Sequence, residues 1–139
     1  MGTARLGELM TLELPQQNDW INANHRYGHW AQKAKLTKAW REQAETAAIL
    51  HSGYFAGRVR IVVTVHKTTN RRYDVGNLAP TAKAIVDGLV SAGVLVDDSN
   101  EFVEGPDLRA GEKRDAACVV VTIEQIPPRD ERAFTPVPF

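Results

Sequence analysis

Acidic side chains and one lysine are concentrated in the middle of the sequence, in the segment 71–98 (RRYDVGNLAPTAKAIVDGLVSAGVLVDD). Carboxylates suit Mg²⁺, which prefers oxygen ligands and needs few of them because it keeps several of its waters. Held beside a phosphodiester, the ion activates a water and neutralises the transition state, and a nearby ammonium stabilises charge on the phosphate. The segment therefore indicates a hydrolytic Mg²⁺ site, with Mn²⁺ as a substitute. The candidate ligands are Asp74, Asp87, Asp97 and Asp98, with Lys83 as the cation beside them.

The same residues also have ordinary structural interpretations. Lys83 and Asp87 are four residues apart, as in an ion pair on a solvated helix face, and the remaining acids suit loops and turns. No fixed metal-ligand motif of the HExxH or CxxC kind is present. Spacing alone leaves both interpretations open.

Hydrophobic periodicity predicts the elements that position this segment. Strands are expected at 9–14 and 59–65, and at 101–109 and 115–126, the last two joined by the turn AGEK. One helix is expected to bury Leu36, Trp40, Ala44, Ala47 and Leu50 and to end before Gly53; a second buries Leu78, Ala82, Ile85, Val86 and Leu89, with Asn77 as its cap and Gly93 as its end. The order β-α-β-α-β-β predicts one α+β (mixed α/β) domain, with two helices on a mixed sheet. It spans residues 1–126, and a Pro-rich tail follows at 127–139.

Charge is segregated along the chain although its formal net value is zero. Residues 21–72 contain ten Lys or Arg against two acids, and residues 73–107 contain one Lys against seven acids. This suits a protein that binds a polyanion with one surface and divalent cations with another, although folding can also pair the two segments as surface salt bridges. If the polyanion is DNA, the expected contacts are Asn24, Arg26, Lys33, Lys35, Lys38, Arg58, Arg60, Lys67, Arg71, Arg72 and Asn77.

Other features of the sequence bear on the compartment and on the roles of the histidine and loop aromatic residues. The chain has no apolar run long enough for a membrane span and no secretory signal, and its single Cys118 lies in an apolar strand pattern, so a cytoplasmic protein is expected. The dispersed His25, His29 and His66 do not indicate a zinc site. The loop aromatics Trp20, Tyr27 and Trp30 suit either stacking on bases or anchoring of the loop at 16–29 to the core.

The acidic segment resembles the RusA family of Holliday-junction resolvases, found in bacteria and prophages. The family pattern is Asp-x-Asp-Asn-Leu, then Lys-x-x-x-Asp-x-Leu, then a hydrophobic stretch and Asp-Asp. Its pieces are matched in order by Asp74, Asn77 and Leu78, by Lys83, Asp87 and Leu89, and by Asp97 with Asp98. The likeness in kind and order of elements covers Leu9 to Ile126. Two departures are Gly76, where the family has its second acid, and a longer spacing between Leu78 and Lys83.

The resemblance implies a dimeric, Mg²⁺-dependent endonuclease that makes paired nicks in four-way DNA. It implies Asp74 and Asp98 as metal ligands and Lys83 as a catalytic cation, so the catalytic set would be Asp74, Lys83 and Asp98. A four-way junction has approximate two-fold symmetry, which a homodimer with one site per subunit matches. Alternatives are a flap or branched-DNA nuclease of the same fold, a catalytically silent DNA-binding protein in which Gly76 marks a decayed site, and a protein-interaction domain.

Overall fold

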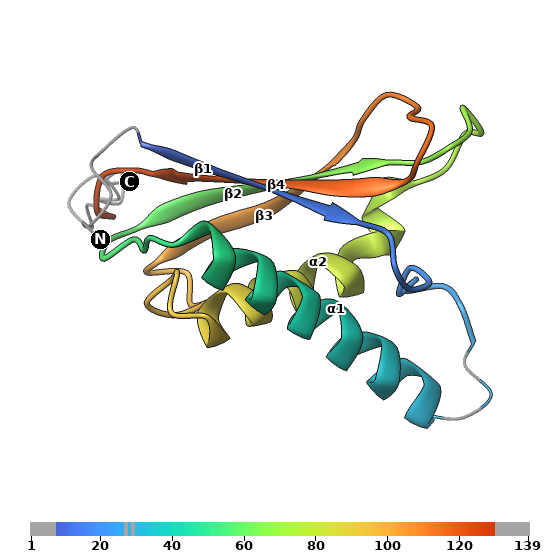
Figure 1. Ribbon diagram of the computed structural model, residues 1–139, viewed down its shortest axis with the longest axis horizontal. Coiled ribbons are helices and arrows are strands. Elements are labelled where there is room, and N and C mark those ends of the chain that lie inside the picture. The colour runs from blue at the N-terminus through green and yellow to red at the C-terminus, as the bar shows by residue number, and fades with distance from the viewer. Residues whose placement is uncertain (1–7, 27, 29, 130–139) are drawn as a thin grey trace, which may run out of the picture.

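Four strands form one sheet, and two helices cover one of its faces (Figure 1). The computed structural model describes residues 8–26, 28 and 30–129. The elements, in chain order, are β1 (Leu9–Pro15), α1 (Trp30–His51), β2 (Val59–His66), the 3₁₀ helix η1 (Val75–Leu78), α2 (Ala79–Ser91), β3 (Val103–Ala110) and β4 (Cys118–Gln125). The predicted α+β class and the order β-α-β-α-β-β are confirmed. Tyr27, His29 and residues 130–139 of the expected tail lie outside the described residues.

The strand order across the sheet is β1-β4-β2-β3. β4 is antiparallel to both of its neighbours, whereas β2 and β3 run parallel. The expectation that the last two strands form a pair joined by a turn is therefore wrong, because β2 lies between β3 and β4. The chain from β2 to β3 passes through η1 and α2, which places the acidic segment in the connection between two parallel strands.

The core lies between the sheet and the helices. In β1 and β2 the residues alternate between buried and more exposed positions, as expected for strands that are covered on one face. The largest buried side chains include Trp40 from α1, Ile61 from β2, Ile85 and Leu89 from α2 and Ile123 from β4. All five residues predicted for the inner face of α2 are buried.

The two helices pack closely on each other, and Gly88 of α2 makes this possible. A Cβ at this position would overlap the backbone carbonyl of Arg41 and lie 2.9 Å from the Cβ of Ala44 in α1. Leu50, by contrast, was expected on the inner face of α1 but is 80% exposed. The buried face of α1 includes Ala48 where Ala47 was predicted. Leu50 therefore lies on the side of the helix that faces solvent.

The start of the second helix also differs from expectation. The N-terminal cap is Asp74, whose Oδ1 accepts a hydrogen bond from the backbone N–H of Gly76 at 2.9 Å, and Asn77 lies within η1. The 3₁₀ turn precedes α2, so the side-chain cap sits one turn earlier than the apolar periodicity suggests. Pro80 in the first turn and Gly93 after the end, at φ +80°, agree with the prediction.

Neither helix in the described part of the chain combines the length and the apolar character that crossing a membrane requires.

Candidate functional site

Lys83 is the centre of a small charged cluster on the outer face of α2. Its Nζ lies 3.1 Å from Oδ1 of Asp87 and 3.0 Å from Oδ2 of Asp98. The first contact joins successive turns of one helix, as the spacing predicted. The second joins residues that are fifteen apart in sequence. Two pieces of the sequence pattern that are separated along the chain therefore meet at one ammonium group.

The chain that follows α2 brings Asp98 to this position. Gly93 adopts a positive φ that turns the chain, and Val94 and Leu95 are then buried in the core. The carbonyl of Val94 also accepts a hydrogen bond from the N–H of Phe55 at 2.8 Å. These contacts hold the returning segment, so Asp98 does not depend on Lys83 alone for its placement.

The ion pairs change the ionisation of both partners. The hydrogen bond from Lys83, together with its positive charge, lowers the pKa of Asp98. In the same way, the hydrogen bonds to Asp98 and Asp87 raise the pKa of Lys83. Both groups are therefore charged at neutral pH. They remain accessible, since the side chain of Lys83 is 64% exposed and that of Asp98 is 41% exposed.

Of the two remaining predicted ligands, Asp97 lies beside this cluster and Asp74 makes no hydrogen bond or ion pair with it. Asp97 accepts a hydrogen bond from the N–H of Asp98 at 2.7 Å, which fixes the turn between the two acids. The carboxylate of Asp74 is bound to the backbone of Gly76, and no hydrogen bond or ion pair joins it to Lys83 or Asp98. In the ranges 8–26 and 30–129, with Gly28, no three acidic, histidine or cysteine side chains gather as metal ligands do.

These carboxylates fit one kind of Mg²⁺ site better than another. A closed cage needs several converging ligands, which the described residues do not supply. Mg²⁺ that binds together with phosphate needs only one or two carboxylates, since waters and phosphate oxygens complete its six positions. Asp87 and Asp98 each place one oxygen on Lys83 and are partly exposed, so their second oxygens suit the latter type of site.

Gly76 lies close to the carboxylate of Asp74. A Cβ at this position would be 3.1 Å from Oδ1 of Asp74, and both residues are exposed. A carboxylate at position 76 would therefore project beside that of Asp74. The glycine leaves Asp74 as a single acid at the start of η1.

Some of the predicted DNA-binding residues are exposed, and others already contact another part of the protein. Asn24, Arg26, Lys33, Lys35, Arg71 and Arg72 are exposed, on the loop after β1, on the first turns of α1 and on the connection before η1. Others have partners of their own: Lys38 pairs with Glu42, Arg60 with Asp107, and Lys67 lies 3.8 Å from the ring centre of Tyr73. Arg58 is half-buried, and the backbone carbonyl of Asn77 accepts from the N–H of Ala23.

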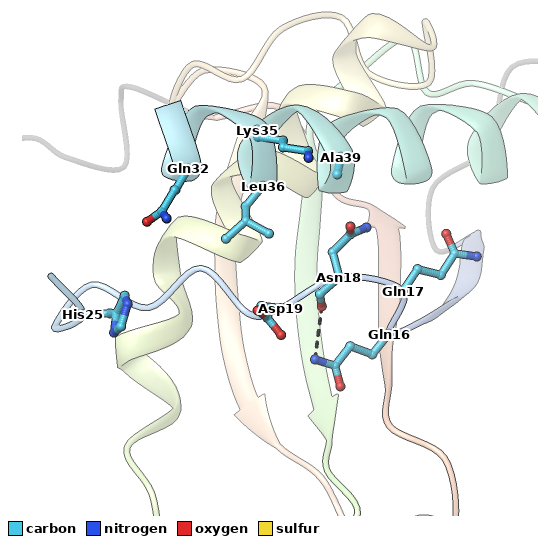
Figure 2. Close-up of a pocket in the computed structure, with 9 residues that line it drawn as sticks. All are labelled: Gln16, Gln17, Asn18, Asp19, His25, Gln32, Lys35, Leu36 and Ala39. Atoms are coloured by element: carbon cyan, nitrogen blue, oxygen red, sulfur yellow. Dashed lines mark hydrogen bonds between the residues drawn. The ribbon is translucent and has the colours of Figure 1, made fainter. Parts of the chain in front are cut away.

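The loop between β1 and α1 is fixed to both helices. The indole N–H of Trp40 donates to the carbonyl of Asp19 at 2.9 Å, and the ring of Trp20 stacks on that of Trp40 with centroids 5.4 Å apart. The hydroxyl of Thr81 accepts from the N–H of Ile21 at 2.8 Å and donates to its carbonyl at 3.0 Å. Trp20 thus anchors the loop, one of the two roles expected for it. Figure 2 shows the cleft that the loop forms with α1.

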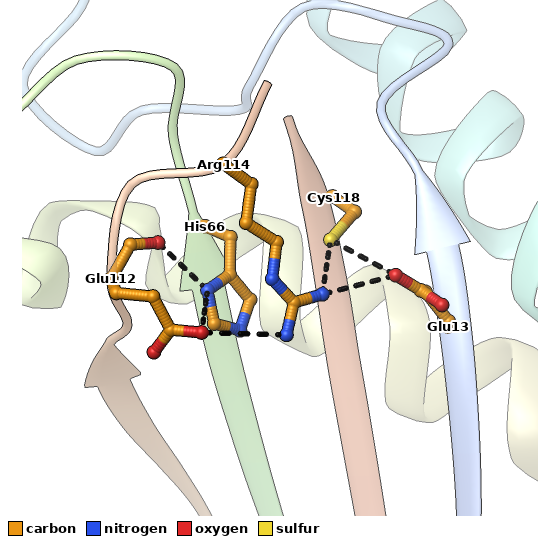
Figure 3. A network of polar contacts seen from close by, with 5 residues as sticks. All are labelled: Glu13, His66, Glu112, Arg114 and Cys118. Atoms are coloured by element: carbon orange, nitrogen blue, oxygen red, sulfur yellow. Dashed lines mark hydrogen bonds and ion pairs between the residues drawn. The ribbon is translucent and has the colours of Figure 1, made fainter. Parts of the chain in front are cut away.

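A second polar cluster lies at one end of the sheet (Figure 3). Arg114 reaches Glu13 at 3.0 Å, the Sγ of Cys118 at 3.2 Å and Glu112 at 3.7 Å, and the Nδ1 of His66 lies 2.9 Å from the carbonyl of Glu112. Burial raises the pKa of the Cys118 thiol, which keeps it protonated and unreactive. The cluster ties β1, β2 and β4 to the connection at 111–117, so we interpret it as structural. Only the burial of Cys118 was evident from the sequence.

No protein-family model matches the chain, and no curated protein matches it.

Proposed function

We propose that the protein is a Mg²⁺-dependent, structure-selective endodeoxyribonuclease of the RusA type, which acts as a homodimer and resolves four-way DNA junctions by paired nicks. One observation carries the proposal: Lys83, Asp87 and Asp98 meet in one accessible cluster. These residues come from two consecutive pieces of the sequence pattern that suggested the family. The exposed basic residues on the loop and α1 give further support, because phosphate contacts supply affinity with little base preference.

The residues of the chain have distinct roles in the proposed reaction. Lys83 binds a non-bridging oxygen of the scissile phosphate and stabilises the charge that develops there. Asp87 and Asp98 orient the ammonium and would hold Mg²⁺ through their second oxygens, with waters and phosphate oxygens completing its coordination. When bound, the ion supplies Lewis-acid activation of the phosphate and of a water. The low pKa of Asp98 keeps its carboxylate ionised and ready to bind a cation at neutral pH.

Cleavage assays on defined DNA test this proposal. Four-way junctions, forks, flaps and linear duplex are incubated with the protein in Mg²⁺ or Mn²⁺, and the nicked strands are mapped. We expect symmetric nicks in the junction and little cutting of linear duplex. Lys83→Ala and Asp98→Asn should each lower the cleavage rate by on the order of 10²- to 10³-fold, as when a charge-stabilising group is removed elsewhere. Lys113→Ala removes the same charge from an exposed position on the connection at 111–117 and should leave the rate unchanged.

The alternatives give different results in the same assay. Equal cutting of linear duplex would contradict structure selectivity, and a preference for flaps would favour a flap nuclease. A wild-type protein that binds junctions but is inert with both metals would indicate a silent DNA-binding protein. In that case Gly76→Asp is informative, because the new carboxylate would lie beside Asp74. We expect this variant to bind Mg²⁺ more tightly than wild type, measured by calorimetry.

A further inference from the structure

The cleft between the loop at 16–25 and the first half of α1 is a candidate binding site in its own right (Figure 2). Its volume is about 750 Å³, within the range of roughly 300–1,000 Å³ that small-molecule sites occupy. It lies on the same loop whose backbone is bonded to the beginning of α2. The cleft and the acidic segment are therefore parts of one connected region.

Carboxamide side chains supply most of the polar groups of this cleft. Gln17 and Asn18 come from the loop and Gln32 from α1. Among the described residues, none of these three carboxamides has a hydrogen-bond partner. Each offers both a donor and an acceptor. Leu36 and Ala39 of α1 add apolar surface between them. The cleft thus combines unused donors and acceptors with an apolar wall, which suits a flat heterocycle that has polar edges and apolar faces.

The backbone that carries these carboxamides is held in place. The carbonyl of Asp19 is bonded to Trp40, and both backbone groups of Ile21 are bonded to the buried hydroxyl of Thr81. A ligand would therefore order only the ends of side chains and would not have to order the loop. Such preorganisation lowers the entropic cost of binding.

The surrounding charge indicates that the ligand is part of a polyanion. Residues 21–41 contain five Lys or Arg and no acid. Lys35, which has no side-chain partner among the described residues, lies at the cleft. Asp19 also lines the cleft, and its carboxylate disfavours a phosphate next to it. A nucleotide with its base at Asn18 and its phosphate at Lys35 would place the negative charge at the cation rather than beside Asp19 (Figure 2).

We propose that this cleft binds one unpaired nucleobase of a DNA strand, with Asn18, which points toward α1 in Figure 2, at the base edge, Leu36 at its face and Lys35 at the adjoining phosphate. Carboxamides pair well with base edges, because each offers a donor and an acceptor to the base. The inference rests on the proposed function, since bases at a branch point are those most easily unstacked. It adds to that function a site that distinguishes a base from a bare backbone.

Fluorescence anisotropy with two short labelled strands tests the inference. One probe is a deoxyadenosine hexanucleotide, and the other has the same sugar-phosphate backbone with abasic residues only; both are titrated in EDTA, so that nothing is cleaved. We expect wild type to bind the base-bearing strand more tightly, by about tenfold, the effect of one good carboxamide-to-base contact. The triple variant Gln17→Ala, Asn18→Ala, Gln32→Ala should lose this preference, whereas Lys35→Ala should weaken both strands alike. Asn100→Ala and Lys113→Ala, both at exposed positions away from the cleft, should behave as wild type.

Each outcome separates the inference from the proposed function. Equal binding of both strands by wild type, or an undiminished preference in the triple variant, would overturn the inference even if junctions are cut. A base preference that the triple variant loses, in a protein that cuts no DNA, would support the cleft and contradict the nuclease. Circular dichroism checks that the triple variant is folded, which we expect because its three carboxamides bond to no described residue.

Discussion

At the scale of single residues, the Lys83 ammonium is held between two carboxylates that face solvent. Such exposed pairs contribute little to folding stability, because water and salt screen them. Their effect is on ionisation and position: Asp98 stays charged, and Lys83 is kept on one side of α2. An arrangement with little structural benefit and a fixed geometry is consistent with a role in binding phosphate.

The pKa of Asp98 provides a direct test of this contact. Because Lys83 lowers it, the stabilisation from the contact is fully present above the ordinary pKa of an Asp and disappears as the pH falls through the lowered value. We expect Lys83→Ala to move the titration midpoint of Asp98 upward, as measured by NMR of its side-chain carboxyl carbon. Asp87→Asn leaves the Lys83–Asp98 contact in place and serves as the control. An Asp98 midpoint that is the same in wild type and Lys83→Ala would show that the two groups do not meet in solution.

At the scale of elements, the close contact of α1 and α2 depends on one missing side chain. Gly88 faces the backbone of α1 at Arg41 and the methyl group of Ala44. Any side chain here separates the helices, which also carry the cleft and the acidic cluster. The geometry of both candidate sites is thus sensitive to this crossing.

Gly88→Ala should therefore destabilise the protein by about 1–3 kcal/mol, the usual cost of overpacking a core, although alanine favours a helix more than glycine does. The free energy of unfolding is measured by urea denaturation. In the control Gly57→Ala the new Cβ meets only the end of Gln125, at 3.7 Å, and we expect little change. A neutral or stabilising effect of Gly88→Ala would mean that the two helices are farther apart at their crossing than this packing requires.

Local patterns predicted the elements well and their long-range partners poorly. The alternation in β2 and the helical spacing of Ala82, Ile85 and Leu89 follow from which face is buried, so the sequence displays them. The position of β2 between β3 and β4 has no local signal, and closeness in the chain suggested a hairpin instead. The first turns of α1 were missed because they are largely exposed and carry no apolar stripe.

In the candidate site, too, the local contact was predictable from the sequence and the long-range contact was not. The Lys83–Asp87 pair follows from helical spacing, whereas the approach of Asp98 depends on how Val94 and Leu95 enter the core. The carboxamides of the cleft were also missed. Their signal was the polar run Gln16–Gln17–Asn18 directly after a strand, but Gln32 joins it only through the packing of the loop on α1.

At the scale of the whole molecule, folding leaves part of the basic segment 21–72 without acidic partners in the described ranges. Arg71 and Arg72 stay exposed without ion pairs among the described residues, while Arg60 is paired with Asp107 on the sheet. The folded chain therefore presents free positive charge close to the acidic segment, where a DNA backbone would need it.

Junction affinity should consequently fall steeply with salt, and the removal of one cation that binds a phosphate should reduce the log–log slope by about 1. We expect Arg71→Ala with Arg72→Ala to lower the slope by up to about 2, measured by anisotropy at several salt concentrations in Ca²⁺. Arg60→Ala should change it less, because its partner Asp107 already neutralises it. Junction affinity independent of salt would instead favour a protein-interaction domain.

The hydroxyl of Thr81 holds both backbone groups of Ile21, and the carbonyl of Asn77 holds Ala23. Three hydrogen bonds therefore join the loop to the start of the acidic segment, so a displacement of one segment would also displace the other. A graft of this loop into another protein should therefore carry residues 16–26 and 74–81 together, because each segment supplies the hydrogen-bond partners of the other.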